Sequence, residues 1–243
     1  MSALSTSGFL PDRPPLHLPY VDEEERDVVL AEITDLFDDL PTLCLTVAQK
    51  HIREDRLDVP TNERVFAALV ALVETMLDED GPEISPEQHG QLLFLTLVPG
   101  VTFAVALQVA FGVAMADANV PRFAELTACL ERVGLDADGD VVLPQPPPTF
   151  APIARLLRGE ARRAIDIARV RRGIQVLRMT AALAPALFVV PIFCVLAWLH
   201  WAGGRRPLAM AYLSAAQTVD PGSRMVTRLS ELFMVRLPLW LCE

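Results

Sequence analysis

The stretch FCVLAWLHWAGGRRPLAMAYLSAAQTVDP, residues 193–221, decides the fold of this chain. Large and small apolar residues recur along it at helical spacing, on both sides of a glycine turn at Gly204. Small residues at Ala209 and Ala216 let two helices approach closely, while large residues fill the space between them. Pro221 then closes the second segment, because proline cannot continue a helix. The stretch therefore predicts two antiparallel helices.

The same stretch resembles one unit of the TPR helical repeat. Phe193, Leu196 and Ala197 fall on the positions of its first helix, and Leu213 joins the two alanines on the second. His200 stands where that pattern usually has an aromatic residue. The pattern recurs only loosely elsewhere in the chain. We therefore expect an all-α protein, an irregular TPR-like helical repeat or bundle of roughly ten helices.

Helix-starting residues and breakers organise the rest of the chain. Asp22 with Glu25, and Ser85 with Gln88, have the spacing of capping pairs. Helices are expected over residues 22–39, 41–57, 60–80, 86–98, 101–118 and 121–134, and again from 153 onwards, with breaks near Gly173, Pro191, Gly203 and Pro221. The predicted regions are a mobile tail (1–20), an N-terminal helical region (21–134), an acidic turn and Pro-rich linker (135–152) and a C-terminal TPR-like helical region (153–243).

Charge and cysteine usage indicate where the protein works. The formal net charge of -10 repels phosphate at long range, so the bulk charge does not favour nucleic acid. The first twenty residues lack a basic start followed by an apolar run, so no secretory signal is expected. The four cysteines are widely spaced, which is typical of free thiols in a reducing compartment. We expect a cytoplasmic protein.

Two stretches without formal charge, residues 92–116 and 179–204, are each long enough to cross a bilayer. Prolines interrupt both, and polar residues such as Gln108 and His200 lie within them. The repeat pattern also accounts for much of the second stretch. Buried helices in a soluble protein are therefore the favoured interpretation, and a two-span integral membrane protein is the alternative.

Residues 196–233, LAWLHWAGGRRPLAMAYLSAAQTVDPGSRMVTRLSELF, resemble the C-terminal part of an uncharacterised actinobacterial family, a domain of unknown function. Residues 85–101, SPEQHGQLLFLTLVPGV, look like the middle region of that family. The N-terminal α/β half of the family is not recognisable here. The resemblance implies an actinobacterial or actinophage origin and a helical C-terminus, and it carries no activity.

No catalytic, cofactor or metal motif stands out in the sequence. The run from Asp136 to Asp140 imitates the start of a calcium loop, but Val141 and Pro147 occupy the places of the required glycine and glutamate. No two histidines stand one helical turn apart, and phosphate loops and nucleophile elbows are missing. We expect a protein that is not an enzyme and that has no catalytic, cofactor-binding or metal-binding residues.

Residues 155–178 carry eight arginines against two acidic residues, so an arginine-rich helix with the arginines along its outer face is expected in this stretch, ahead of the break near Gly173. This face has three interpretations: a solvated face that pairs with the acidic N-terminal helix, a surface for an acidic partner protein, or a contact for nucleic-acid phosphate. The apolar C-terminal tail either folds back on the core or binds a partner. The residues expected to bind a partner are Arg155, Arg158, Arg162, Arg163, Arg169, Arg172, Leu239 and Trp240.

Together these observations favour a non-catalytic helical adaptor or oligomerising protein. Its partner would be another protein or a second copy of the chain. Besides the membrane alternative above, a regulator that contacts nucleic acid through the arginine-rich helix is a further alternative, limited by the lack of interleaved aromatic residues.

Overall fold

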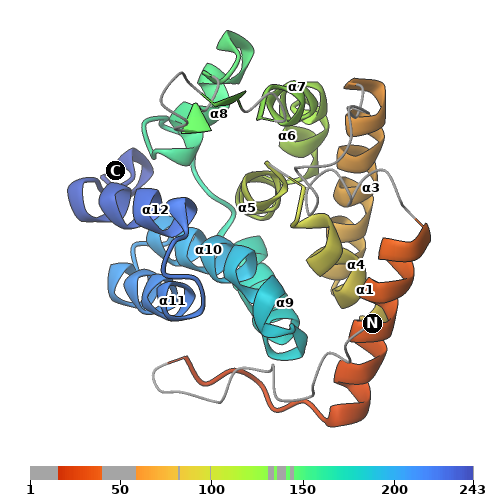
Figure 1. The fold of residues 1–243 in the computed structure, drawn as a ribbon. Coiled ribbons are helices and arrows are strands. Elements are labelled where there is room, and N and C mark those ends of the chain that lie inside the picture. The colour runs from red at the N-terminus through yellow and green to blue at the C-terminus, as the bar shows by residue number, and fades with distance from the viewer. Residues whose placement is uncertain are drawn as a thin grey trace.

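The computed structural model describes residues 16–39, 59–81, 83–98, 100–130, 134–135, 141–142 and 145–242. The fold is all-α, as predicted, and the described residues include eleven α-helices (Figure 1). They are α1 (Glu23–Asp39), α3 (Val59–Leu77), α4 (Pro86–Leu95), α5 (Val101–Phe111), α6 (Val113–Asp117), α7 (Val120–Leu130), α8 (Ala151–Leu157), α9 (Ile167–Leu183), α10 (Ala186–Ala202), α11 (Arg206–Val219) and α12 (Arg224–Val235). Short elements are the antiparallel pair β1 (Gly134–Leu135) and β2 (Val141–Val142), and the 3₁₀ helices η2 (Pro148–Phe150) and η3 (Leu239–Leu241).

Both predicted capping pairs form. The backbone N–H of Glu25 donates to Asp22 Oδ1 at 2.8 Å, and the backbone N–H of Asp22 donates to Glu25 Oε2 at 3.3 Å. Ser85 and Gln88 make the same reciprocal pair at the start of α4, at 2.9 and 3.4 Å. Each pair satisfies backbone donors that the first helical turn leaves without partners. The helix expected over residues 41–57 lies outside the described residues.

Three predicted features of helix continuity are wrong. The helix expected over residues 101–118 is divided into α5 and α6 by Gly112, whose φ of 86° and ψ of 173° suit glycine alone. The breaks expected at Gly173 and Pro191 do not occur, because Gly173 lies inside α9 and Pro191 inside α10. Around Pro191, burial of the neighbouring Val189, Val190 and Ile192 helps to offset the hydrogen bond that proline removes.

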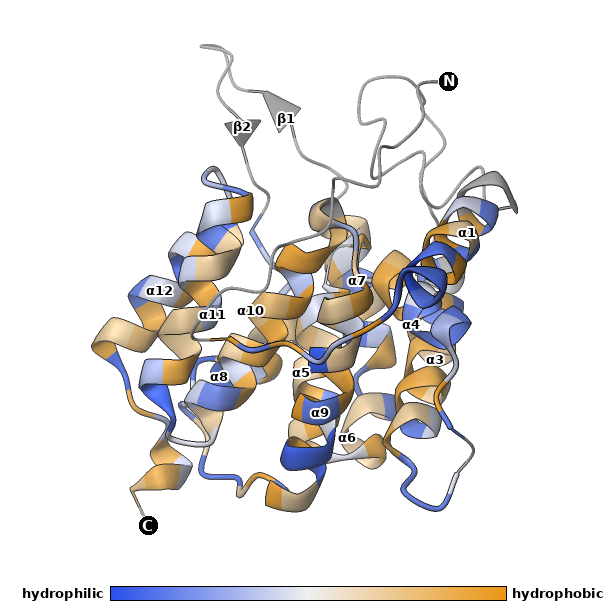
Figure 2. Ribbon diagram, turned by 90° about the horizontal axis from the view of Figure 1, so that it is seen from below, coloured by the Kyte–Doolittle hydropathy of each residue, from blue (hydrophilic) through white to orange (hydrophobic). Residues whose placement is uncertain are grey.

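The helix α10 lies at the centre of the molecule. It packs against α11, α5, α9, α12 and α4, and its residues from Ile192 to Ala202 are all buried. Figure 2 shows the most apolar residues gathered on helices such as α5 and α10 in the interior. Burial of these apolar side chains is the dominant favourable contribution to folding. The two stretches without charge thus form parts of α4, α5, α6, α9 and α10.

No helix in the described part of the chain combines the length and the apolar character needed to cross a membrane.

The predicted helix pair of residues 193–221 corresponds to α10 and α11, which pack side by side over most of their length (Figure 1). Gly204 makes the turn with a φ of 77°, and both Ala209 and Ala216 are fully buried. The ring of His200 stacks on Tyr212, with centroids 5.4 Å apart and planes 13° from parallel. His200 therefore fills the place of an aromatic residue. The TPR-like character of the whole fold stays a prediction.

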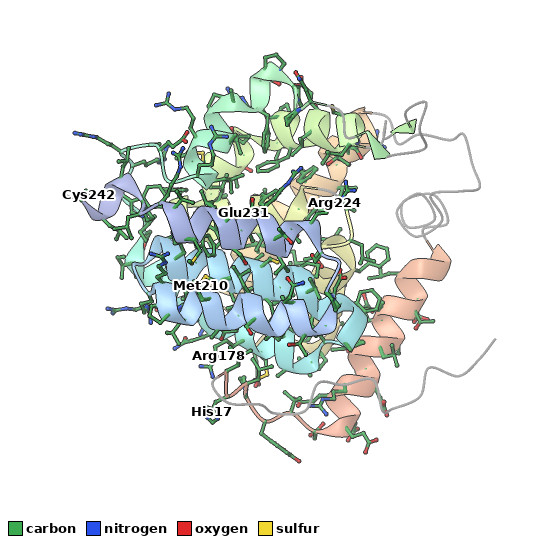
Figure 3. The ribbon with its side chains drawn as sticks, turned by 60° about the vertical axis from the view of Figure 1, so that its left-hand side comes forward. His17, Arg178, Met210, Arg224, Glu231 and Cys242 are labelled. Carbon is green, nitrogen blue, oxygen red and sulfur yellow. The ribbon has the colours of Figure 1, made fainter. Side chains whose placement is uncertain are left out.

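One hydrophobic cluster runs through both predicted helical regions. Phe150, in η2, enters this cluster next to Phe123 of α7, with ring centroids 5.6 Å apart. At the other end of the chain, Leu16 and Leu18 pack against the same cluster, and Arg178 donates to the carbonyl of His17 (Figure 3). Residues 1–15 of the predicted tail and most of residues 131–144 lie outside the described residues. The division of the chain at residues 135–152 stays a prediction.

Candidate functional site

The predicted arginine-rich helix is not one helix. The helix α8 ends at Leu157, the backbone from Arg158 to Asp166 is not helical, and α9 begins at Ile167. Gly159 turns the chain with a φ of 69°, and Asp166 caps α9 by accepting from the backbone N–H of Arg169 at 3.0 Å. A Cβ atom on Gly159 would lie 2.8 Å from Pro238 Cα, so the close approach of the C-terminal tail requires glycine here.

As a result, the six predicted partner-binding arginines occupy different surroundings. Arg155 lies on α8, and Arg158, Arg162 and Arg163 lie on or just after the turn that follows it. Arg169 turns towards α3, and Arg172 lines a pocket beside α4. In one continuous helix over residues 155–178, these arginines would share common faces. The folded chain does not have those faces, because residues 158–166 are not helical.

Arg169 forms a two-pronged ion pair with Glu74 of α3. Its Nη2 donates to Glu74 Oε1 at 2.6 Å and its Nη1 donates to Oε2 at 3.1 Å. Gln108 of α5 donates to the same Oε1 at 2.9 Å, so the group links three helices. Both charged side chains are mostly shielded from solvent. Arg169 is therefore a structural residue, and no Arg169 charge is left over for a partner.

The C-terminal tail folds back on the core. The backbone N–H of Leu239 donates to the carbonyl of Gly159 at 2.8 Å, and Trp240 Nε1 donates to the carbonyl of Ala202 at 2.9 Å. The Trp240 ring meets Phe111 edge to face, with centroids 5.8 Å apart. The same ring lies 6.4 Å from that of Trp201, whose Nε1 donates to the carbonyl of Arg236. The indole of Trp240 thus makes its hydrogen bond and its ring contacts within its own chain.

Large apolar side chains nevertheless remain exposed around this tail. Nine large apolar residues of the described part of the chain are exposed, and five of them fall within residues 234–241. They are Met234, Val235, Leu237, Leu239 and Leu241, each between 41% and 80% exposed. These five residues are called the C-terminal surface below. Apolar residues that gather on a surface in this way typically mark an interaction site.

Several arginines lie near the C-terminal surface. Arg206 donates to the carbonyl of Met234 at 2.8 Å, and Arg163 lies over the ring of Phe111, which contacts Trp240. Arg158 and Arg236 both pair with Glu160. The hydrogen bond from Arg158, with the nearby charges of Arg236 and Arg155, holds the pKa of Glu160 below its ordinary value. Figure 3 shows this end of the molecule, with long side chains projecting beside Cys242.

Among the described residues, these contacts bring five arginines, Arg155, Arg158, Arg163, Arg206 and Arg236, and one carboxylate, Glu160, to this part of the molecule, so its charge balance there is positive. The arrangement can hold an apolar segment that carries negative charge. Sequence reasoning found part of this group, but Arg206, Arg236 and the exposed residues from Met234 to Leu237 were not among the expected residues. The sequence feature that corresponds to the exposed apolar residues is the apolar run that begins at Phe233. Whether that run is exposed depends on how α12 ends.

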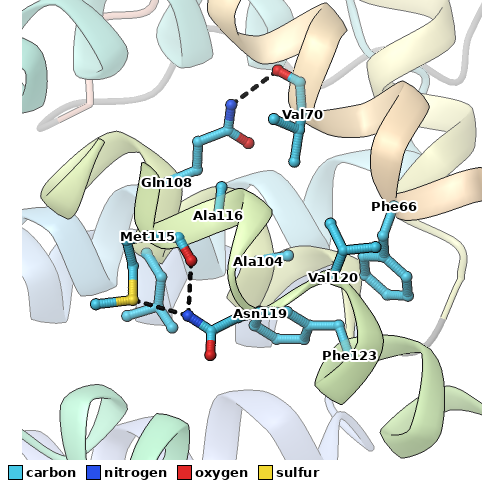
Figure 4. Close-up of a pocket in the computed structure, with 10 residues that line it drawn as sticks. Phe66, Val70, Ala104, Gln108, Met115, Ala116, Asn119, Val120 and Phe123 are labelled. Carbon is cyan, nitrogen blue, oxygen red and sulfur yellow. Dashed lines mark hydrogen bonds between the residues drawn. The ribbon is translucent and has the colours of Figure 1, made fainter. Parts of the chain in front are cut away.

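A small internal cavity between α3, α5, α6 and α7 does not offer a binding site (Figure 4). Its volume is about 10 Å³, room for no more than one water molecule. Gln108 donates to the carbonyl of Val70 at 2.8 Å at one side, and Asn119 donates to the carbonyl of Met115 at 2.6 Å at the other (Figure 4). The cavity is a packing defect inside the helical core.

No three metal-ligating side chains come together among the residues that the structure describes. Cys194 lies in the core on α10, and burial raises the pKa of its thiol to about 12, which keeps it protonated and unreactive. The expected acidic turn at residues 136–140 lies outside the described ranges.

Comparisons with protein-family models, curated protein sequences and solved structures give no match to this chain. The resemblance of residues 196–233 to an actinobacterial family therefore stays a prediction.

Proposed function

We propose that this protein is a non-catalytic helical adaptor that uses the C-terminal surface to bind an acidic segment of another protein. The observation that carries the proposal is the gathering of exposed apolar residues close to several arginines. Apolar side chains of the partner would cover Leu237 and Leu239, and its carboxylates would pair with the surrounding guanidinium groups. Arginine suits this role because its planar fork holds a carboxylate by two hydrogen bonds.

The composition of the surface favours a protein over other partners. Nucleic-acid bases stack on exposed aromatic rings, but the five residues of the C-terminal surface are aliphatic or sulfur-containing. Membrane interfaces favour Trp and Tyr, and the indole N–H of Trp240 is already bonded to Ala202. An acidic segment with leucine-like residues matches both parts of the surface.

Site-specific photo-crosslinking in the native host tests this proposal. A photoreactive amino acid replaces Leu237 in one variant and Val113 in a control, since Val113 is also exposed but lies on α6. We expect one protein to crosslink through Leu237 and not through Val113, at a segment rich in Asp or Glu. The synthetic segment should bind the purified chain, with affinity about tenfold lower after Arg158→Glu.

Other outcomes would overturn the proposal. Equal crosslinking from both positions means that the C-terminal surface is not the binding site. Crosslinks to a second copy of the chain indicate self-association, and crosslinks to lipid or nucleic acid indicate the corresponding alternative. A synthetic segment whose affinity does not respond to Arg158→Glu removes the role of the arginines.

A further inference from the structure

An open pocket of about 290 Å³ lies between α9, the start of α4 and the residues that precede α4. It is remote in sequence from the C-terminal surface, and no residue of that surface lines it. Ile84, Val176 and Met179 supply apolar walls, and His89 and Arg172 supply polar groups of different character. Glu83 and Gln175 lie at the same pocket and are more exposed than His89.

The hydrogen bonds of His89 determine which ring nitrogen carries its proton. His89 Nδ1 lies 2.8 Å from Thr180 Oγ1, and the Thr180 hydroxyl donates to the carbonyl of Val176 at 3.1 Å. A hydroxyl has one proton, so with the Thr180 proton assigned to the carbonyl of Val176, Thr180 accepts from His89. Nδ1 is therefore protonated in the neutral ring, and Nε2 carries a lone pair. Among the described residues, nothing donates a hydrogen bond to Nε2.

Burial keeps this ring neutral. Only 3% of His89 is exposed, and its desolvation lowers the pKa of the imidazole to about 4. At physiological pH, His89 therefore offers a hydrogen-bond acceptor and not a positive charge. A base with so low a pKa would remove protons poorly at neutral pH. A binding role for His89 is therefore favoured over general-base catalysis.

Arg172 supplies the pocket with a positive charge and hydrogen-bond donors. No ion pair of Arg172 occurs among the described residues, although Glu83 lines the same pocket. Its Nε atom is buried and has no hydrogen-bond partner within the described part of the chain. The two Nη atoms also make no hydrogen bond among the described residues, and this outer end of the guanidinium is the part that a ligand can reach. One guanidinium fits one carboxylate, and Glu83 nearby disfavours a ligand with more negative charge.

We propose that this pocket binds a small carboxylic acid that carries a hydroxyl or amino group next to an apolar body. The carboxylate pairs with Arg172, the hydroxyl or amine donates to His89 Nε2, and the apolar body contacts Val176 and Met179. The pocket volume suits a ligand of about the size of an amino acid, since pockets for drug-sized ligands begin near 300 Å³. This ligand site is independent of the proposed protein-binding surface.

Three acids with one carbon skeleton test the proposal by calorimetry on the full chain. Leucic acid has a hydroxyl, leucine has an amine, and isocaproic acid has neither donor. We expect leucic acid or leucine to bind at least about tenfold more tightly than isocaproic acid, because only they can donate to Nε2. Imidazole nitrogen NMR of the unmodified protein provides a second readout, in which the Nε2 resonance of His89 moves with the tighter ligand.

Variants on α9 test the second contact. Arg172→Met keeps the aliphatic stem and removes the charge, and it should weaken all acids by about tenfold or more. Arg171→Met is the matched control, because Arg171 is exposed and does not line the pocket. Equal affinities of all three acids overturn the proposal, as does equal loss in the two variants. Absence of saturable binding up to roughly 10 mM also overturns it.

Discussion

Arg169 on α9 holds Glu74 on α3 by two hydrogen bonds, although 95 positions separate them in the sequence. The shorter bond is 2.6 Å, and Gln108 of α5 donates to the same carboxylate oxygen. All three helices contribute residues to the hydrophobic core, so the pair fixes how α3 sits against α9. When one member of such a partly shielded ion pair is removed, the other charge keeps its desolvation cost and loses the partner that offset it.

Arg169→Ala should therefore lower the free energy of unfolding by about 2 kcal/mol, because Glu74 keeps its charge and loses both hydrogen bonds. Arg169→Lys should recover only part of this loss, since an ammonium cannot bind the carboxylate in the same two-pronged way. Chemical denaturation at neutral pH measures both. An Arg169→Ala variant as stable as the parent would mean that the pair contributes nothing to the fold.

Gly173 should be intolerant of even one added methyl group. A Cβ atom there would lie 2.4 Å from Val109 Cγ1, so α9 would have to move away from α5. We expect Gly173→Ala to cost about 1 to 3 kcal/mol in unfolding free energy. The double variant Gly173→Ala/Val109→Ala should recover part of the loss, and a double-mutant cycle by thermal or chemical unfolding gives the coupling. Strictly additive effects of the two changes would contradict this contact.

His200 should make the fold sensitive to mild acid. Burial, together with Arg205 and Arg178, lowers the pKa of His200 to about 4, below the ordinary value of 6.5. Between about pH 6.5 and pH 4, His200 is therefore protonated in the unfolded chain and neutral in the folded chain. Stability from this group is complete above about pH 6.5 and is lost as the pH falls towards 4. His89 acts in the same direction.

His200→Phe separates the two histidines, because phenylalanine can keep the stacking on Tyr212 without titrating. Denaturation curves at pH 7 and at pH 5 should show a smaller loss of stability in this variant than in the parent. If both proteins lose the same free energy over this interval, the protonation of His200 is not coupled to folding.

Two changes in the C-terminal tail should separate stability from binding. Trp240→Ala removes a ring that packs on Phe111 and a hydrogen bond to Ala202, and it should cost about 2 to 3 kcal/mol, below the value for a fully buried tryptophan. Leu237→Ala should change stability by no more than about 0.5 kcal/mol, because its side chain is exposed. Unfolding experiments on both variants check the contrast. A large loss in Leu237→Ala would mean that this residue belongs to the core.

Part of the site could be predicted from the sequence and part could not. The composition of residues 155–178 and of the apolar tail indicated a binding surface, and Arg155, Arg158, Arg163 and Leu239 do lie in one neighbourhood. Arg169 and Arg172 do not share it, because the turn at Gly159 and the cap at Asp166 interrupt the expected helix. The pocket at His89 had no sequence signal, since Thr180 lies 91 positions away.

The sequence by itself determined those local features that depend on neighbouring residues alone. Helix starts at Asp22 and Ser85 depend on interactions between residues three apart, so a short window contains all the information they need. The pair α10 and α11 follows from apolar spacing and a glycine turn for the same reason. Only the tertiary structure decided which helix Arg169 reaches, where Trp240 docks and what surrounds His89. These contacts join distant segments, and their geometry depends on how every helix between them packs.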